Sequence, residues 1–187
     1  MNNLIVVEFI TLDGVVEDPD GSEATPNGGW AFRHGPEPIT GDKFELGSLL
    51  DTGVLLLGRT TWELFAKLWP SRTDPYSTKM NNIPKLVASR SLTSTEKWQN
   101  SSLIEDDLVT SVRRHKAEQD VIVTGSVSVV QTLAQHDLID EYRLMVLPTV
   151  VGKGLRLFSE DTPPVDLRRT SILEKGAAAL TYYTKAE

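Results

Sequence analysis

Cysteine is absent from this chain of 187 residues, which excludes disulfides, thiolate metal sites and cysteine nucleophiles. No apolar run approaches the ~20 residues that a membrane helix needs. The N-terminal residues 1–14 lack a basic region, and Glu8 interrupts their apolar run. They therefore predict a strand and not a signal peptide. These absences favour a cytoplasmic protein with no membrane partner.

Positive charge is also scarce. The chain has 19 Lys and Arg residues against 26 Asp and Glu residues, and its net charge is −7. An acidic surface repels the phosphate backbone, so we expect no nucleic-acid partner, although local arginines could hold a small anion. His34, His115 and His136 are far apart in the sequence, and we expect no metal site.

The apolar pattern predicts strands that alternate with helices as far as residue 140, followed by strands alone. The expected strands are 3–10, 53–58, 84–89, 101–104, 120–125, 141–151, 166–174 and 178–185, and the expected helices are 41–51, 59–68, 106–118 and 126–135. Residues 69–83 are expected to be a loop. Residues 11–40 form a longer loop that is rich in Gly, Pro and Asp, and such loops are usually lids or binding loops.

This alternation predicts the α/β fold class, with a mostly parallel central sheet, an antiparallel C-terminal edge and helices on both faces. The length favours a single domain over residues 1–187. The apolar strand within 139–158, with Leu144–Leu147 near the C-terminal edge, suggests pairing between two copies. We therefore expect a homodimer.

Three strand ends carry glycine or serine beside an arginine or hydroxyl groups. Gly58-Arg59 and Gly125-Ser126 stand where a buried strand turns into a helix, and Ser89-Arg90 ends a strand at a turn. Ligands bind outside the carboxyl ends of strands in open α/β sheets, and a helix N-terminus attracts phosphate. The pattern predicts a phosphate-rich ligand such as a dinucleotide, although the Rossmann and P-loop glycine motifs are both absent.

Each of these features also has a structural explanation. The two glycines could serve tight packing of strand against helix, and Arg59 and Arg90 could be solvated surface charges. Glu8 interrupts an apolar strand, and buried carboxylates need partners. It is therefore either at an edge, in a buried salt bridge, or a pocket carboxylate with a raised pKa.

An ordered set of motifs covers nearly the whole chain. It comprises 8–15, 28–30, 55–63, 89–90, 123–126, 140–141 and 148–158. This set resembles the dihydrofolate-reductase-like superfamily, and within it the reductase domain of the bifunctional riboflavin-biosynthesis deaminase/reductase and its stand-alone relatives. The resemblance implies a three-layer fold, a homodimer and NADPH as cofactor.

The resemblance also assigns cofactor-binding residues by position. These are Gly58, Arg59, Thr60 and Thr61 at the pyrophosphate, Ser89 and Arg90 at the adenosine 2′-phosphate, and Gly125, Ser126 and Val127 over the pyrophosphate. The sequence departs from the family at one of them. Dihydrofolate reductases have two glycines joined by a cis peptide where this chain has Gly125-Ser126.

The substrate half rests on fewer residues. Glu8, Asp13 and Asp42 are the candidate catalytic carboxylates, and Trp30 and Phe32 are candidates for stacking on a flat ring. Asp42 precedes Gly58 by the spacing at which dihydrofolate reductases place the carboxylate that binds the pterin, but it could simply start a helix. Asp13 could shape a turn, and the aromatic residues could anchor the loop.

The sequence thus predicts an NADPH-dependent reductase of a pterin, a pyrimidine or a similar flat heterocycle. We expect Glu8, Asp13 and Trp30 to line one pocket under the 11–40 loop. Dihydrofolate and the riboflavin precursor both remain open as substrates. The alternative is a nucleotide-binding homologue without turnover. An unrelated hydrolase or phosphoryl enzyme ranks last, because neither a G-x-S-x-G motif nor an acidic metal cluster is present.

Overall fold

The computed structural model describes residues 2–186 as an α/β structure. Its elements are β1 (Leu4–Thr11), the 3₁₀ helix η1 (Trp30–Arg33), α1 (Leu49–Thr52), β2 (Val54–Gly58), α2 (Arg59–Leu68), α3 (Pro75–Asn82), β3 (Lys85–Ala88), β4 (Ser101–Leu103), α4 (Leu108–Glu118), β5 (Val121–Val123), α5 (Val127–Gln135), β6 (Glu141–Leu147), β7 (Leu167–Lys175) and β8 (Ala178–Lys185).

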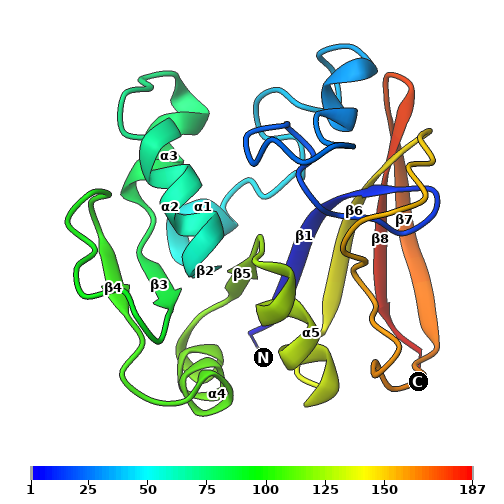
Figure 1. Ribbon diagram of the computed structural model, residues 1–187. Coiled ribbons are helices and arrows are strands. Elements are labelled where there is room, and N and C mark those ends of the chain that lie inside the picture. Colours follow the sequence, from blue (N-terminus) through cyan, green and yellow to red (C-terminus); the bar gives the residue numbers. More distant parts are fainter. Residues whose placement is uncertain (1, 187) are drawn as a thin grey trace.

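One eight-stranded sheet runs through the molecule in the order β4-β3-β2-β5-β1-β6-β8-β7 (Figure 1). The strands from β4 to β6 are parallel, whereas β8 pairs antiparallel with both β6 and β7. The predicted sheet, mostly parallel with an antiparallel C-terminal edge, is therefore confirmed.

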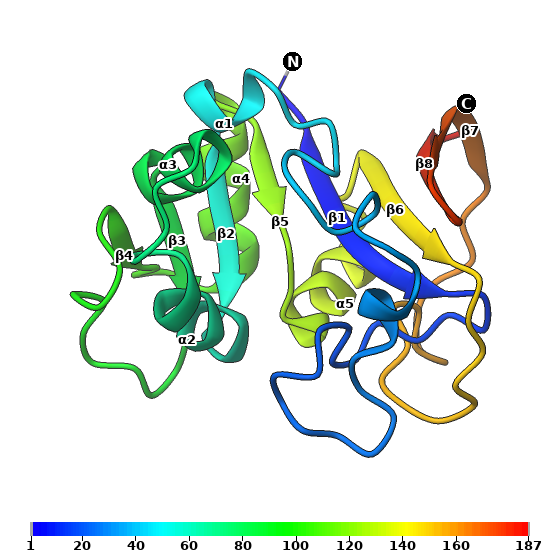
Figure 2. The same ribbon diagram turned by 90° about the horizontal axis from the view of Figure 1, so that it is seen from above.

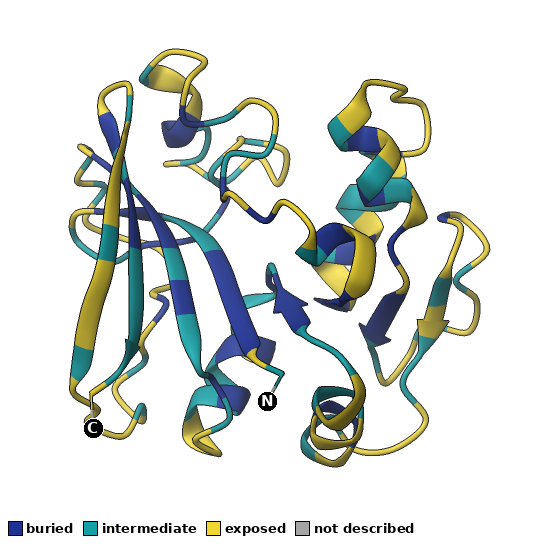
Figure 3. Ribbon diagram, turned by 180° about the vertical axis from the view of Figure 1, so that it is seen from behind, coloured by how far each residue is buried: buried dark blue, intermediate teal, exposed yellow. Residues whose placement is uncertain are grey.

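Helices cover both faces of the sheet and give it three layers (Figure 2). Alternate residues of a strand point to opposite faces. In β1, Ile5 and Val7 join the core under α1, α2 and α3, while Leu4 and Val6 join the core under α4 and α5. The inner strands are accordingly buried, and the long β7–β8 hairpin is more exposed (Figure 3).

Two local predictions were wrong. The helix expected over 41–51 is reduced to α1, because Glu45 and Gly47 adopt positive φ angles of 52° and 53° that no α-helix accommodates. The loop expected over 69–83 contains α3. That helix starts on Asp74, which accepts a hydrogen bond from the Ser77 amide, with Pro75 in its first turn.

The argument for edge pairing was also wrong about the strand. β6 lies between β1 and β8, so the Leu144–Leu147 segment is inside the sheet and not at an uncovered edge. The predicted strand over 141–151 ends at Leu147, because Pro148 follows and has no amide to donate. The end strands of the sheet are β4 and β7.

The centre of the sheet opens at the carboxyl end of β1. β5 pairs with β1 only as far as Val6, while β1 continues to Thr11 beside β6. Between β1 and β5 the chain connections leave in opposite directions, and such a position is where open α/β sheets bind ligands. Among the described residues, no helix is long and apolar enough to cross a membrane.

Candidate active site at the carboxyl ends of the strands

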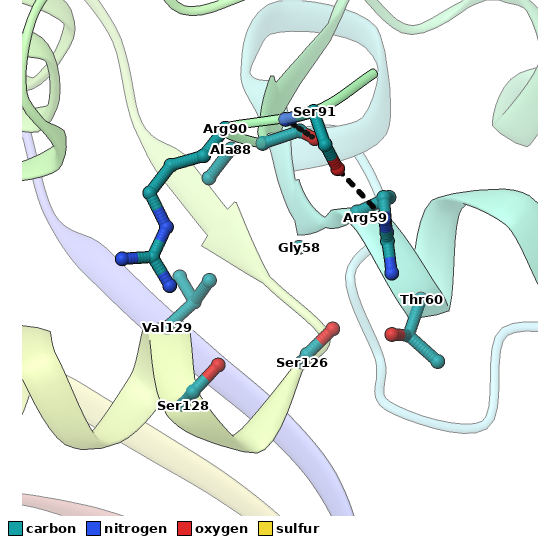
Figure 4. Close-up of a pocket in the computed structure, with 10 residues that line it drawn as sticks. Gly58, Arg59, Thr60, Ala88, Arg90, Ser91, Ser126, Ser128 and Val129 are labelled. Carbon is teal, nitrogen blue, oxygen red and sulfur yellow. Dashed lines mark hydrogen bonds between the residues drawn. The ribbon is translucent and has the colours of Figure 1, made fainter.

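Two adjoining cavities lie at this end of the sheet. The smaller one has a volume of about 320 Å³ and lies between the ends of β2 and β3 and the start of α5 (Figure 4). The larger one, of about 930 Å³, extends along β1 and α2. Both are lined by Thr60, Ser126 and Ser128, so one extended ligand can occupy the two together.

The helices that begin at these cavities are not capped by their own N-cap residues. α2 starts after Gly58 and α5 after Ser126, and neither of these residues caps the helix that follows it through its side chain. The amide of Thr61 in α2 donates one long hydrogen bond of 3.5 Å to the hydroxyl of Ser126. The first amides of a helix have no partner within it and attract negative charge. The two N-termini therefore provide hydrogen-bond donors for an anion.

Glycine at position 58 is required by packing. A Cβ atom on Gly58 would lie 2.8 Å from Cβ of Ser126 and 2.9 Å from its backbone nitrogen, which no side chain tolerates. Gly125 has a φ of 84°, and the Gly125-Ser126 peptide is cis. For Gly58 the structural explanation holds: the residue lets the two strand–helix turns meet.

The smaller cavity is flanked by two arginines (Figure 4). Arg59 donates a hydrogen bond of 2.7 Å to the hydroxyl of Ser91, and Arg90 is exposed at the cavity. Ser89 is also in the lining, but its hydroxyl accepts hydrogen bonds from the amides of Ser91 and Leu92. Ser89 thus shapes the turn that presents Arg90.

The structure gathers the nine predicted cofactor residues around the two cavities. The smaller cavity is lined by Gly58, Arg59, Thr60, Ser89, Arg90 and Ser126, and the larger one by Thr60, Thr61, Gly125, Ser126 and Val127.

Glu8 lines the larger cavity from the middle of β1. A Cβ atom on Gly125 would lie 3.5 Å from Oε1 of Glu8, so the carboxyl group is next to the cis peptide. None of the ion pairs between described residues involves Glu8. Burial raises the pKa of Glu8 to about 8, and the carboxyl group therefore keeps its proton at neutral pH.

Asp13 does not line either cavity, and its expected position in a shared pocket with Glu8 was wrong. Its carboxylate accepts hydrogen bonds from the Thr11 hydroxyl and from the amides of Gly152 and Val151. The Thr11 bond foremost, together with these amides, lowers the pKa of Asp13. The carboxylate is ionised and joins the end of β1 to the 148–156 segment.

Trp30 is likewise absent from the lining of the cavities. Its side chain is fully buried, and its indole nitrogen donates a 2.9 Å hydrogen bond to the carbonyl of Glu17, so it anchors the loop. Phe32 does line the larger cavity and is 56% exposed. It is therefore available to a ligand.

Asp42 also points elsewhere. It accepts hydrogen bonds from the amides of Leu46 and Gly47 and is not in the cavity lining. Its neighbour Lys43 lines the larger cavity instead. A carboxylate at the spacing of the pterin-binding residue is thus present in the sequence but not in the pocket.

Sequence reasoning missed Lys43 and the aromatic wall around it. The ammonium group of Lys43 lies 5.7 Å from the ring centre of Phe9, 5.5 Å from that of Phe44 and 5.3 Å from that of Tyr76. Burial lowers the pKa of Lys43 to about 8. No local motif marks this residue, because two of the three rings, those of Phe9 and Tyr76, come from distant segments of the chain.

Asp18 was missed as well. It is 2% exposed and accepts hydrogen bonds from the amides of Glu23 and Thr25 and from the Thr25 hydroxyl. Burial opposes ionisation, but these hydrogen bonds lower the pKa of Asp18 overall. The ionised carboxylate organises the 18–29 part of the long loop, which borders the larger cavity. The D-P-D-G sequence at 18–21 was a usable turn signal.

Within residues 2–186, no three His, Asp or Glu side chains are grouped closely enough to hold a metal ion. The chemistry available at the cavities therefore consists of hydroxyl groups, helix N-termini, arginines, aromatic rings and several ionisable groups of the larger cavity. These include Glu8 and Lys43, whose pKa values are shifted by burial, and the carboxylates of the 17–23 segment.

Comparison with known sequences identifies a family. The model of the family described as the RibD C-terminal domain matches residues 2–180. Two proteins of Bacillus subtilis, YyaP and YwjB, are similar to this chain at 27% identity over 183 residues and 26% over 181 residues. The alignments cover 93% and 95% of this chain, and 90% and 94% of the two proteins, both of which are described as uncharacterized.

Solved structures have the same fold. A provisionally named riboflavin biosynthesis protein of Shewanella sp. PV-4 aligns over 99% of both chains with a TM-score of 0.76 and 20% identity. The deaminase/reductase of Thermotoga maritima named for 5-amino-6-(5-phosphoribosylamino)uracil aligns with a TM-score of 0.63 and 14% identity. That alignment covers 99% of this chain and 57% of the longer protein. The fold is dihydrofolate-reductase-like, as the resemblance implied.

Proposed function

Because the chain belongs to the RibD C-terminal domain family, we propose that it is an NADPH-dependent reductase of a flat heterocycle. Membership in this family supports an oxidoreductase of the pyrimidine-reductase kind. The substrate class includes 5-amino-6-(5-phosphoribosylamino)uracil and, as the second candidate, dihydrofolate. All of residues 1–187 act as one reductase domain in this proposal.

One observation carries the proposal: a polar cavity at two helix N-termini without side-chain caps of their own continues into a cavity lined by aromatic rings and by the carboxyl group of Glu8, whose pKa burial raises. The first suits a pyrophosphate and the second a pair of flat rings. A larger cavity without an adjoining polar cavity would suit a reaction that needs no nucleotide.

The residues of the smaller cavity fit NADPH. The N-termini of α2 and α5 would hold the pyrophosphate, with hydroxyl groups of Thr60 and Ser126 at hand. Arg90 would bind the adenosine 2′-phosphate, since a guanidinium group can hold phosphate through two hydrogen bonds. Arg59, fixed by Ser91, would add a second positive charge.

When bound, NADPH supplies the hydride. The overall reaction adds this hydride and one proton across a double bond of the substrate and releases NADP⁺. Glu8 would provide the proton from its carboxyl group, which is protonated because burial raises its pKa to about 8. The aromatic side chains of the larger cavity would exclude water and orient the ring.

The second candidate function, as distinct from the second candidate substrate, is that of a nucleotide-binding homologue that no longer turns over. It would keep the polar cavity and lack a proton donor. The placement of Glu8 beside Gly125 favours the reductase, because a protonated carboxyl group is in the wall of the larger cavity.

NADPH oxidation at 340 nm with each candidate substrate tests the proposal. We expect oxidation with 5-amino-6-(5-phosphoribosylamino)uracil or dihydrofolate, and slower oxidation when NADH replaces NADPH. NADPH binding without oxidation in the presence of either substrate would favour the nucleotide-binding homologue without turnover. Absence of NADPH binding would contradict both.

We also propose a homodimer. Since β6 is internal, the supporting feature is now β7, an end strand on which Ile172 and Leu173 are 52% and 39% exposed. Sedimentation should give twice the 20.7 kDa mass of one chain. A single-chain mass at micromolar concentration would contradict this.

A further inference from the structure

Lys43 is the one lysine of the larger cavity whose ammonium group is surrounded by aromatic rings among the described residues. Phe9 comes from β1, Phe44 follows Lys43 in the chain, and Tyr76 is in the first turn of α3. Their ring centres are all within 5.7 Å of the Lys43 nitrogen. The faces of such rings attract a cation, so they hold the ammonium group in place.

This ammonium group forms no ion pair with a described residue, although the charge of Asp42 nearby raises its pKa against the larger lowering by burial. None of the ion pairs between residues 2–186 includes Lys43. The nearest carboxylate in the sequence, Asp42, is bonded to the amides of Leu46 and Gly47. An ammonium group has three N–H donors, and π faces satisfy them poorly. Lys43 lines the larger cavity, so a ligand there can accept a hydrogen bond from it.

Whether the side chain at this place donates or accepts hydrogen bonds decides which ligand atoms it can bind. A carboxylate at this place would accept hydrogen bonds from an amino or amidine edge, such as that of a pterin. Lys43 can only donate. A ligand that offered N–H groups to it would leave donors facing donors in a partly desolvated site, which is unfavourable.

We propose that Lys43 is a specificity-determining residue that binds an electron-rich oxygen of the substrate. That oxygen is either a ring carbonyl, as in a uracil, or an acidic oxygen on a substituent. The inference rests on the proposed function, since it concerns the substrate of the same site. It places uracil-type rings ahead of rings that present a 2,4-diamino edge.

The supporting chemistry is consistent with an acceptor ligand. Phe9 and Phe44 pack edge to face with ring centres 5.2 Å apart, so the cage is rigid on one side. Burial lowers the pKa of Lys43 to about 8, and an oxygen acceptor bound beside the ammonium group would stabilise its charged form. Arg72 also lines the cavity, but it is exposed and contacts Trp69.

Calorimetric titration of the whole chain tests the proposal without relying on turnover. The ligands are 5-amino-6-ribitylaminouracil, its 5′-phosphate, inorganic phosphate and 2,4-diaminopyrimidine. We expect the wild type to bind at least one uracil more tightly than the diaminopyrimidine. Lys43→Met should weaken uracil binding about tenfold or more, the effect of losing one hydrogen bond from a charged donor. Binding of the diaminopyrimidine should not weaken.

The different ligands in the titration distinguish a ring carbonyl from an acidic oxygen on a substituent. Loss of affinity for the unphosphorylated uracil assigns Lys43 to a ring carbonyl, and loss confined to the 5′-phosphate or inorganic phosphate assigns it to the acidic substituent. Either result supports the proposal. Lys43→Arg keeps a charged donor and should bind more like the wild type than Lys43→Met does.

Lys97→Met is the matched control, because Lys97 is exposed and lines neither cavity. It should leave every affinity unchanged. Equal affinities in the wild type and Lys43→Met, a wild-type preference for the diaminopyrimidine, or binding of none of the rings would each overturn the proposal. NADPH binding is titrated on the same samples. Absence of NADPH binding would contradict the proposed function. Normal NADPH binding together with equal ring affinities in the wild type and Lys43→Met would contradict this inference alone.

Discussion

The two cavities share Thr60, Ser126 and Ser128 but are built from different chemistry. The smaller cavity is lined by hydroxyl groups, two arginines and two helix N-termini. The larger one is lined mostly by apolar and aromatic side chains, with Glu8 and Lys43 displaced from their ordinary pKa values by burial. The contrast teaches that the smaller cavity is suited to a negatively charged ligand, whereas burial in the larger cavity shifts the pKa values of its own ionisable groups.

The helices show the same division. α3 and α4 begin on Asp74 and Asp107, whose carboxylates accept hydrogen bonds from the amides of Ser77 and Thr110. α2 and α5, which begin at the cavities, have no such cap. A carboxylate cap would occupy the donors and repel phosphate. Among the described helices of eight or more residues, the two without a side-chain cap, α2 and α5, are therefore those that begin at the smaller cavity.

Removing the charge from the smaller cavity should have the largest effect on this contrast. Arg90→Ala should weaken NADPH binding about tenfold or more, because a charge-assisted hydrogen bond to the 2′-phosphate is lost. NADH lacks that phosphate, so its affinity should hardly change. Isothermal titration of both cofactors measures the difference.

Arg113→Ala provides the control, since Arg113 is exposed on α4 and lines neither cavity. It should bind both cofactors as the wild type does. Equal losses of NADPH and NADH affinity in Arg90→Ala would show that Arg90 acts elsewhere on the nucleotide.

The capped helices should respond to mutation in stability alone. Asp107→Ala should lower the free energy of unfolding by ~1 kcal/mol, because the amide of Thr110 loses its acceptor. Urea denaturation measures this change, and NADPH affinity should stay the same. Ser126→Ala, at the uncapped α5, should cost less stability. A drop in NADPH affinity in Asp107→Ala would remove the distinction between the two kinds of helix.

The smaller cavity could be predicted from the sequence because its residues are set by local structure. Gly58-Arg59 and Gly125-Ser126 stand at or just after the ends of the buried strands β2 and β5, and parallel strands bring their carboxyl ends to one edge. The strands of the sheet and most helices were predicted in the same way, from the spacing of apolar residues along the sequence. The α3 helix was missed although Asp74-Pro75 is a recognisable start signal.

The larger cavity could be predicted only in part, because it is assembled from distant segments. Glu8 was identified since a carboxylate stands out in an apolar strand. Lys43 was not, because its neighbours Phe9 and Tyr76 are far away in the sequence. The choice between Asp42 and Lys43 depends on loop geometry, where Glu45 and Gly47 have positive φ angles, and spacing alone does not reveal it.

Asp13 and Trp30 illustrate a further limit. Both occur beside the site, yet their polar atoms bond to backbone groups. The indole of Trp30 bonds within its own loop, to Glu17, and the carboxylate of Asp13 bonds to Val151 and Gly152 of a distant segment. A sequence places such residues near a site but does not say whether they face the ligand or hold the loop. Burial and hydrogen-bond partners decide that, and these depend on the whole fold.

The pH dependence of kcat at saturating substrate and NADPH tests most directly the central claim, which is that Glu8 donates the proton. At saturation kcat does not depend on substrate affinity, so the proposed effect of Lys43 on binding does not alter it. If Glu8 donates the proton, its protonated form is the active one. Since burial raises the pKa of Glu8 to about 8, kcat should be constant near neutral pH and fall about tenfold per pH unit above about pH 8. Glu8→Gln should bind NADPH normally, turn over at least ~100-fold more slowly and lose this pH dependence. A wild-type kcat that stays constant through pH 8, or a Glu8→Gln variant as active as the wild type, would contradict the account.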